Sequence, residues 1–382
     1  MAEPELAFLA ELVAAKSVSS KDPALDVSNK EASEAVASML RGHGFDAELR
    51  EVKGLAGKYN VESLLGPDEA GEGLLLAGHT DTVPYDAAAW ASDPLELSVR
   101  DGRGYGMGAC DMKAFFAAVA GALALVDLKS IKRPLRVWAT ANEECGMEGA
   151  SQIVKDAPAS RHALVGEPTA LVPVYAHKGG MAEKIVCHGR AAHASDPSQG
   201  VSALEAMAKV MAALRTAHEA SCAERADAIF TPPEATMNFG LCRAGAAFNT
   251  VPDHAELWVD RRLLPGEECA AVRKHLHEVA RAAVADMEVK LEFSPLVAGF
   301  EPVLTPPEAP LIAYAAELTG QKPRTVPFGT EAPYYAGAGM DVLIMGAGSV
   351  ADIHQPNESF PLAELEKMTA MTAKIIERFC CQ

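Results

Sequence analysis

The sequence lacks the features of membrane, secreted and nucleic-acid-binding proteins. No apolar stretch approaches the roughly 20 residues that a membrane-spanning helix needs. The N-terminal segment MAEPELAFLAELVAAKS has neither a basic leader nor a cleavage site after a long apolar run. Basic residues are scarce, with 34 Lys and Arg against 52 Asp and Glu and a net charge of −18. Because binding to phosphate backbones depends on clustered Lys and Arg, we expect no nucleic acid as partner. Because the sequence shows neither a membrane span nor a secretion signal, we expect a cytoplasmic protein with no membrane as partner.

The sequence also lacks paired cysteine motifs. Its cysteines are scattered without CxxC spacing, as expected for free thiols in a reducing cytoplasm. They are Cys110, Cys145, Cys187, Cys222, Cys242, Cys269, Cys380 and Cys381. Cys110 and Cys145 lie beside acidic residues, which leaves a nucleophilic role open for either, although small buried thiols are common packing residues.

What is present is the pattern of a layered α/β protein. With 382 residues and 49% hydrophobic content, the chain is long enough for two domains. Four short apolar runs are typical of buried strands: GLLLAG at 73–78, LRVWATA at 135–141, HALVG at 162–166 and DVLIMG at 341–346. The Ala-rich segment at 113–127 predicts a buried helix, and strands alternating with helices indicate an α/β domain.

The middle of the chain has a different pattern. The segments MAEKIVCHG and HAELWVDRRL alternate apolar and polar residues as half-buried antiparallel strands do, and 202–218 and 267–285 are typical of amphipathic helices. The α/β pattern then resumes, with helices expected near 309–319 and 362–379. We therefore predict an α/β domain formed by residues 1–178 and 293–382, interrupted by a smaller α+β domain at 179–292.

Imidazole or carboxylate side chains follow each of the four predicted strands, and another precedes the Ala-rich helix. In chain order they are His79, Asp111, Glu143, Glu144, Glu167 and His354. Ligands bind at the carboxyl edge of open α/β sheets. Two imidazoles and three carboxylates suit a pair of Zn²⁺ ions. One of the adjacent Glu143 and Glu144 would then bind a metal ion, and the other would act as general base.

Each of these residues has an ordinary explanation when taken alone. Asp111 could cap the following helix, and Glu167 before Pro168 could be a turn residue. Asp81, two residues after His79 on the same side of an extended segment, could hold the far ring nitrogen of that histidine. The convergence of several such groups on one edge indicates a metal site.

The motifs GHTDTVP, GMGACDMK, ATANEE, GEPT and IHQPNE carry a family resemblance over nearly the whole chain. In order and spacing they resemble those of the metallopeptidase family that includes acetylornithine deacetylase, succinyl-diaminopimelate desuccinylase, aminoacylases and glutamate carboxypeptidases. The resemblance implies a zinc-aminopeptidase-like three-layer catalytic domain, interrupted by a smaller α+β dimerisation or lid domain. It also implies a homodimer.

The resemblance implies two zinc ions, for which cobalt or manganese are possible substitutes. His79, Asp111 and Glu167 would bind one ion, and Asp111, Glu144 and His354 the other. All five residues match family motifs in this sequence.

Further catalytic roles also follow from the resemblance. Glu143 matches the family's general base, and Asp81 matches its orienting acid. His193, in GRAAHAS, matches a histidine that reaches the neighbouring subunit's site as an oxyanion donor.

The segments AHKGG, GTEAPYY and DRRLLPG are most similar to the acetylornithine deacetylases of this family, which implies N-acetylornithine as substrate and a place in arginine biosynthesis. Asn249 and Arg262 match positions that bind the substrate's carboxylate, with Arg261 as the neighbouring alternative. Glu331 is the expected partner of the side-chain ammonium, because a desolvated cation needs an acidic partner. Alternatives are a desuccinylase, an aminoacylase, an acetylcitrulline deacetylase, a dipeptidase, or a catalytically silent metal-binding relative.

Overall fold

The computed structural model describes residues 3–157 and 159–382, which divide into two compact units. Unit 1 comprises the chain up to Tyr175 together with Leu304–Arg324 and Thr330–Gln382. Unit 2 comprises Ala176–Val303 and Thr325–Gly329. Each unit has its own hydrophobic core, and unit 1 is discontinuous in sequence.

The predicted second domain boundary, between residues 292 and 293, does not coincide with the division between the units. Strand β14 (Lys290–Phe300) crosses that position and pairs with β9 (Gly179–His188) of unit 2 before and after it. The structure places this division after Val303, because the residues after 292 continue the same hydrogen-bonded ladder. The predicted first boundary, between residues 178 and 179, lies close to the division after Tyr175.

A mixed β-sheet runs through unit 1 in the order β1-β2-β6-β3-β7-β17-β8-β15, and β16 pairs with β8. The pairs β6–β3, β3–β7 and β7–β17 are parallel, whereas the pairs β1–β2, β2–β6 and β17–β8 are antiparallel. The strands are β1 (Asp46–Glu51), β2 (Tyr59–Leu65), β3 (Leu74–His79), β6 (Leu135–Thr140), β7 (His162–Pro168), β8 (Val174–His177), β15 (Val303–Leu304), β16 (Arg324–Val326) and β17 (Asp341–Gly346). The carboxyl ends of the parallel strands therefore meet at one edge.

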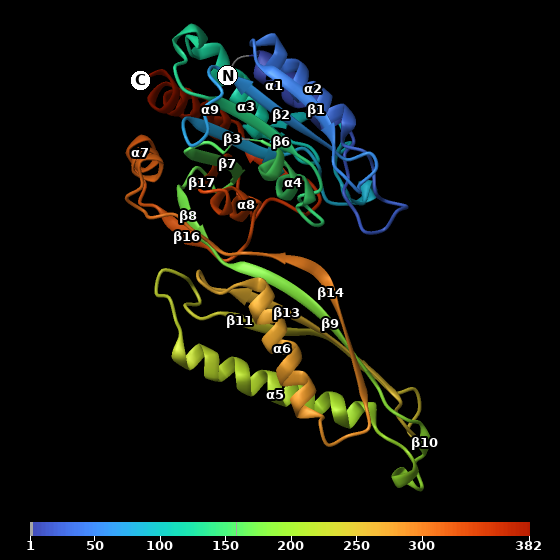
Figure 1. Ribbon diagram of the computed structural model, residues 1–382. Helices are drawn as coiled ribbons and strands as arrows, with labels where there is room; N and C mark the ends of the chain where they lie inside the picture. Colours follow the sequence, from blue (N-terminus) through green and yellow to red (C-terminus); the bar gives the residue numbers. More distant parts are fainter. Residues whose placement is uncertain (1–2, 158) are drawn as a thin grey trace. The chain divides into compact units, whose positions relative to one another are not determined.

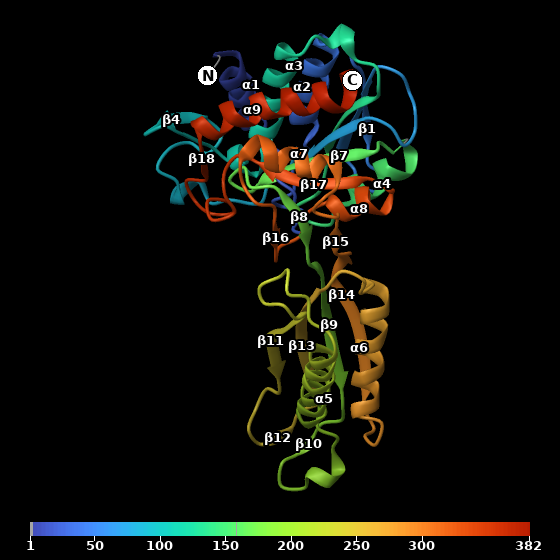
Figure 2. The same ribbon diagram turned by 90° about the vertical axis from the view of Figure 1, so that its left-hand side faces the viewer.

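Helices cover both faces of this sheet and make unit 1 a three-layer α/β/α structure (Figures 1 and 2). One face carries α1 (Glu3–Ala14), α2 (Lys30–Gly42), α3 (Ala114–Leu125) and α9 (Leu362–Ile376). The other face carries α4 (Glu148–Asp156) and α8 (Ala332–Gly337), while α7 (Pro310–Thr319) packs against α9 and β17. A small sheet is formed by β4 (Ser98–Arg100), β5 (Arg103–Tyr105) and β18 (Ser359–Pro361).

The sequence pattern accounts for the centre of unit 1. Strands β3, β6 and β7 are buried at every residue because helices cover both faces, which is why their runs are continuously apolar rather than alternating. Helix α3 (AFFAAVAGALAL) carries no charged residue and is buried over most of its length. The predicted strands and helices of this unit closely match the observed elements, and the predicted α/β class is confirmed.

Unit 2 is an antiparallel sheet with helices on one face. The sheet has the order β11-β13-β9-β14, and the pairing of β9 with β13 runs from His188↔His254 to Gly179↔Leu263. Burial alternates along β9 and β13, because one face packs on the helices. The remaining elements are α5 (Ala203–Glu224), α6 (Cys269–Ala283), β10 (Ala192–His193), β11 (Thr236–Ala244), β12 (Thr250–Val251) and β13 (His254–Leu263).

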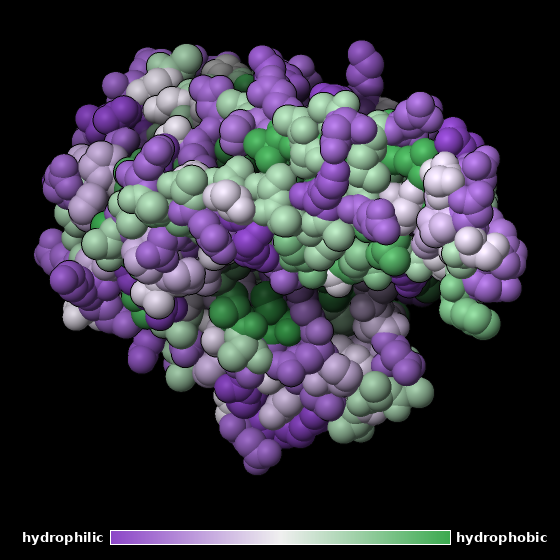
Figure 3. All heavy atoms as spheres, turned by 90° about the horizontal axis from the view of Figure 1, so that it is seen from below, coloured by the Kyte–Doolittle hydropathy of each residue, from purple (hydrophilic) through white to green (hydrophobic). Residues whose placement is uncertain are grey.

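The surface combines hydrophilic and hydrophobic side chains. Figure 3 shows hydrophilic residues spread over the visible face, with hydrophobic ones between them. Of the large hydrophobic side chains in the described residues, Phe248 is the most exposed, at 99%. Within residues 3–157 and 159–382, no helix has the length and apolar character that crossing a membrane would require.

Candidate metal centre

The residues expected to bind metal lie at the carboxyl edge of the parallel strands of unit 1. His79 is the last residue of β3, Glu167 lies near the end of β7, and Glu143 and Glu144 follow β6. These side chains are carried by neighbouring strands because β3 pairs with β6 on one side and with β7 on the other. The topology of the sheet therefore brings together groups that are far apart in sequence.

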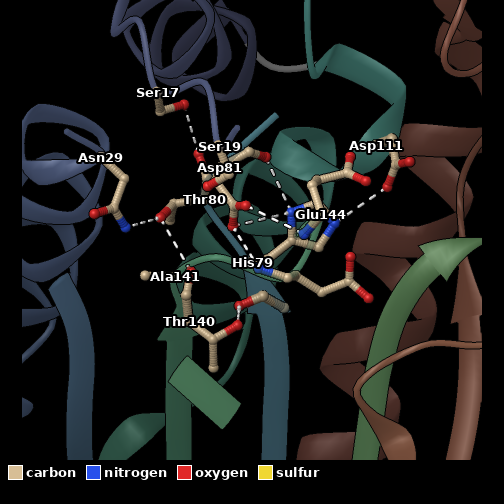
Figure 4. Close-up of polar contacts among 12 residues, drawn as sticks. Ser17, Ser19, Asn29, His79, Thr80, Asp81, Asp111, Thr140, Ala141 and Glu144 are labelled. Atoms are coloured by element: carbon tan, nitrogen blue, oxygen red, sulfur yellow. Dashed lines mark hydrogen bonds and ion pairs between the residues drawn. The ribbon is translucent and has the colours of Figure 1, made fainter. Parts of the chain in front are cut away.

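Asp111 is the carboxylate that lies between the two imidazoles. It belongs to an irregular turn (Ala109–Lys113) before α3, and His354 belongs to the loop after β17. Its Oδ1 lies 3.2 Å from His79 Nε2, a contact drawn in Figure 4, and its Oδ2 lies 3.1 Å from His354 Nε2. The two oxygens thus face different imidazoles, which is the arrangement that a carboxylate shared by two metal ions requires.

One glutamate lies beside each of the two imidazoles that Asp111 contacts. Glu144 Oε1 lies 3.2 Å from His354 Nε2, and Glu167 Oε1 lies 3.8 Å from His79 Nε2. Two donors bound at about 2.0–2.1 Å to one tetrahedral Zn²⁺ ion lie roughly 3.3 Å from each other. The donor atoms of His79, Asp111 and Glu144 also lie within 4.8 Å of one another. These separations fit a metal ion on each side of Asp111.

The charges of the cluster favour a cation. Burial raises the pKa of Glu143 and Glu167 well above the usual range, and neighbouring carboxylates add to the effect. Burial alone would raise the pKa of Asp111 too, but hydrogen bonds with His354 and His79 hold it well below its usual value. Burial alone would lower the pKa of His79, yet its contact with Asp111 and the other carboxylates raise it. Buried charges in proteins are paired or bind metals, and this acid-rich donor set suits metal ions.

Asp81 contacts His79 through its backbone carbonyl oxygen rather than through its carboxylate. The Nδ1 of His79 lies 3.0 Å from the backbone carbonyl of Asp81 and 3.7 Å from its carboxylate. The carboxylate instead accepts hydrogen bonds from the backbone N–H groups of Glu143 and Glu144, at 3.2 and 3.3 Å. When Nδ1 donates to the carbonyl, the lone pair of Nε2 faces Asp111 and Glu167. Asp81 therefore orients both the imidazole and the turn that carries the two glutamates.

A buried polar network supports the strand ends (Figure 4). Ser17 Oγ donates to the carbonyl of Thr80 at 2.7 Å, and Asn29 Nδ2 donates to Thr80 Oγ1 at 2.8 Å. Thr80 Oγ1 in turn donates to the carbonyl of Thr140 at 3.2 Å. The sequence analysis missed these supporting residues, because their partners lie more than 50 residues away and no local pattern marks them.

Glu331 lies in the core of unit 1 rather than on its surface. Its side chain is 0% exposed, and its carboxylate accepts hydrogen bonds from Thr140 Oγ1 at 2.5 Å and from Tyr335 Oη at 2.8 Å. Burial raises the pKa of Glu331, and these two hydrogen bonds lower it. The contact with a substrate ammonium stays a prediction.

Glu358 is a buried carboxylate that the sequence analysis did not single out, although it ends the motif IHQPNE. It is 0% exposed, and it accepts hydrogen bonds from the backbone N–H groups of Gly108, Cys110 and Asp111 at 3.2, 2.8 and 3.0 Å. Burial raises the pKa of Glu358 to about 8, and the charge of Asp111 acts in the same direction. The sequence offered one indication that Glu358 belongs to the site, which is its position four residues after His354 in the same motif.

Two of the remaining predicted residues are neighbours in unit 2. His193 pairs with Thr250 in the short ladder of β10 and β12, and the backbone N–H of Ala194 donates to the carbonyl of Asn249 at 3.0 Å. The ring of His193 is exposed, and its Nδ1 accepts a hydrogen bond from the backbone N–H of Ser195 at 3.1 Å. In the neutral ring, the hydrogen is then on Nε2, which makes His193 a donor. Its catalytic role stays a prediction.

Arg261 and Arg262 differ in their surroundings. Arg261 is 5% exposed, and its guanidinium lies 3.1 Å from the Glu267 carboxylate and donates to His218 Nδ1. Arg262 is half-buried and lies 3.2 Å from Asp260. Of the two arginines, Arg262 is therefore the one whose guanidinium is more available to a ligand. Its contact with a substrate stays a prediction.

Comparison with known proteins identifies the family. Residues 75–378 match the model of "Peptidase family M20/M25/M40". The chain is 36% identical to the acetylornithine deacetylase of Proteus mirabilis over 97% of this chain and 95% of that protein. Its fold is similar to a tripeptidase from Staphylococcus aureus (TM-score 0.78, 20% identity, 100% and 99% of the two chains). A metallo-carboxypeptidase of the M20 family from Sulfolobus solfataricus is also similar (TM-score 0.77, 18% identity, 99% of each chain). The chain therefore belongs to peptidase family M20/M25/M40, and it is a metallo-amidohydrolase similar to acetylornithine deacetylases.

Proposed function

We propose that this chain hydrolyses N-acetylornithine to ornithine and acetate with two bound zinc ions, and that it acts in arginine biosynthesis. The observation that carries the proposal is Asp111, whose two carboxylate oxygens face the imidazoles of His79 and His354 at 3.2 and 3.1 Å. The similarity to acetylornithine deacetylases over almost the whole chain supports the choice of substrate.

The contacts among five side chains support the proposed metal ligands. His79, Asp111 and Glu167 hold one ion, and Asp111, Glu144 and His354 hold the other. Imidazole and carboxylate donors suit Zn²⁺, and Co²⁺ or Mn²⁺ are the expected substitutes. When bound, such ions polarise the acyl carbonyl and lower the pKa of water toward neutrality.

Glu143 is the general base. It is adjacent to the ligand Glu144, and Asp81 holds the backbone of both residues. Its carboxylate accepts the proton of the attacking water and then delivers it to the nitrogen of the leaving amine as the amide bond breaks. The oxygen of that water ends in acetate, and the proton ends on ornithine, so that Glu143 is regenerated.

The substrate is recognised by groups of both signs. Asn249 and Arg262 bind the α-carboxylate, for which a planar guanidinium is well suited. Glu331 binds the side-chain ammonium, and the net charge of −18 is compatible with a cationic substrate. In a homodimer, His193 reaches the active site of the neighbouring subunit and donates a hydrogen bond to the oxyanion that develops on the substrate there.

We also propose that the protein is cytoplasmic. All eight cysteines, which lie within the described residues, are free thiols. Free thiols persist in the reducing cytoplasm, whereas oxidising compartments favour disulfides.

A substrate panel tests the proposal. Hydrolysis rates are measured for N-acetylornithine, N-acetylcitrulline, N-acetylmethionine and N-succinyl-diaminopimelate, with metal stripped and then restored. The expected result is metal-dependent hydrolysis with the highest kcat/KM for N-acetylornithine. A higher kcat/KM for another substrate would correct the substrate, and no metal-dependent hydrolysis of any of them would contradict the enzyme assignment itself.

A further inference from the structure

Glu358 connects the segments that carry Asp111 and His354. These two residues are 243 positions apart in sequence, yet their side chains meet at 3.1 Å. Glu358 follows His354 by four residues, and its carboxylate accepts hydrogen bonds from the backbone of the turn that carries Asp111. The alignment of the two candidate ligands therefore depends on a short piece of chain between His354 and Glu358.

The turn before α3 forms a cradle for an anion. The backbone N–H groups of Gly108, Cys110 and Asp111 all donate to the carboxylate of Glu358, with Oε1 accepting from Cys110 and Asp111 and Oε2 from Gly108. Successive N–H groups that converge in this way form an anion-binding nest. Here the occupant of the nest is a side chain of the protein itself.

The geometry of the turn restricts which residues can form it. Gly108 has a φ of +73°, and a Cβ there would lie 2.5 Å from the side chain of Thr82, so that only glycine fits without rearrangement. Lys113, buried at 1% exposure on the same turn, supplies a positive charge near Glu358. These features partly offset the cost of burying the carboxyl group of Glu358 in a place without solvent.

The segment after His354 is also attached to unit 1 by its neighbours. Strand β18 pairs with β5, and the backbone N–H of Gly106 donates to the carbonyl of Glu358 at 3.2 Å. Arg103 donates to the Ser359 carbonyl at 3.1 Å and to the Asp352 carboxylate at 2.8 Å. These contacts hold the segment on both sides of Glu358, but only Glu358 reaches the backbone N–H of Asp111.

We propose that Glu358 is a positioning residue for the metal centre, which fixes the shared carboxylate of Asp111 relative to His354. The inference rests on the proposed function, because it takes Asp111 and His354 as ligands. Glu358 touches neither metal nor substrate, and it acts by holding the backbone of Asp111. Partners of this kind commonly contribute about 10- to 100-fold to metal affinity or activity.

The test compares Glu358→Ala, Glu358→Gln and the wild-type chain. Each is stripped of metal, titrated with Zn²⁺ by calorimetry, and then analysed for metal content per chain after dialysis. We expect Glu358→Ala to bind the ion shared by Asp111, Glu144 and His354 at least about tenfold more weakly. Glu358→Gln keeps the oxygen that accepts from Cys110 and Asp111 but turns an N–H toward Gly108, so its loss should be smaller.

The matched control is Glu183→Gln in unit 2. Glu183 is also a buried carboxylate, 1% exposed, and it pairs with Arg273 at 2.9 Å and His277 at 3.0 Å. Its replacement should lower the melting temperature but leave the metal content unchanged. A lower metal affinity in the Glu358 variants with normal binding by Glu183→Gln therefore separates positioning from a general loss of stability.

The outcomes also separate this inference from the proposed function. If the wild-type chain binds two ions and both Glu358 variants bind them equally tightly, the positioning role is wrong and the enzyme assignment is untouched. If the wild-type chain itself binds fewer than two ions, the dinuclear assignment fails, and this inference fails with it. If Glu358→Ala does not fold, the Zn²⁺ affinity of Glu358→Gln decides the question by itself.

Discussion

At the scale of single residues, the centre is built from carboxylates with different tasks. Asp111 lies between two imidazoles, Asp81 accepts backbone N–H groups, and Glu358 accepts the N–H groups of a neighbouring turn. The side-chain chemistry is nearly the same in each case. The task of each residue is set by the groups that face it, so residue type alone cannot distinguish a ligand from a support.

Glu331 provides a prediction at this scale. Replacement by Gln removes the negative charge but keeps the size of the side chain, so kcat/KM for N-acetylornithine should fall at least about tenfold relative to N-acetylcitrulline, whose side chain is neutral. The kinetic constants for both substrates are the measurement. Tyr335→Phe, which removes only a hydrogen bond to Glu331, is the control and should leave the ratio unchanged. If Glu331→Gln left the preference for N-acetylornithine over N-acetylcitrulline unchanged, the role of Glu331 would be structural only, through its hydrogen bond with Thr140 at the end of β6.

At the scale of elements, the metal centre depends on the packing of α3 behind it. Helix α3 begins directly after the turn that carries Asp111, and it packs against α1 and α9. Because it lies in the core of unit 1, its position is set by apolar contacts on nearly every side. The core therefore determines where the turn that carries Asp111 ends.

The stability contribution of α3 is testable with two residues of the same helix. Phe116 is 0% exposed, and Phe116→Ala should lower the free energy of unfolding by about 3–5 kcal/mol through lost burial and a cavity. Leu125 is 63% exposed at the end of the helix, and Leu125→Ala should change it by less than about 0.5 kcal/mol. Denaturant unfolding of the metal-loaded protein measures both. Similar values for the two variants would mean that α3 is not a core element.

At the scale of the whole molecule, the proposed catalytic groups are divided between the two units. The proposed metal ligands and Glu143 belong to unit 1, whereas His193, Asn249 and Arg262 belong to unit 2. The two units have separate hydrophobic cores. Completing one active site with a histidine from a second chain is the proposed reason for a homodimer.

A mixing experiment tests that proposal. Glu143→Gln and His193→Ala should each lose most of their activity, because one lacks the base and the other the oxyanion donor. When the two variants are unfolded together and refolded, about half of the dimers are mixed, and each mixed dimer has one site with both groups. Activity should therefore return to about a quarter of the wild-type value.

The control is each variant refolded alone, which should stay inactive. If the mixture shows no more activity than the separate variants, His193 does not act across subunits. Size measurement of the refolded mixture must show dimers for the activity to be interpreted.

The sequence by itself determined the parts that depend on neighbours along the chain. Continuous apolar runs indicated the buried strands, and the His, Asp and Glu residues at their ends indicated the site, because parallel strands direct their carboxyl ends to one edge. The division after Val303 differs from the predicted boundary at residue 292, because the pairing between β14 and β9 is not visible in local periodicity.

Only the tertiary structure decided how the site is supported. Asp81 meets the N–H of Glu143 across 62 residues, Glu331 meets Thr140 across 191, and Glu358 meets the N–H of Asp111 across 247. Such contacts arise when the sheet and its helices pack together, and they leave no periodic signal in the chain. Local patterns therefore indicated the candidate ligands, and long-range packing decided which carboxylates face the candidate metal centre and which form hydrogen bonds with the segments around it.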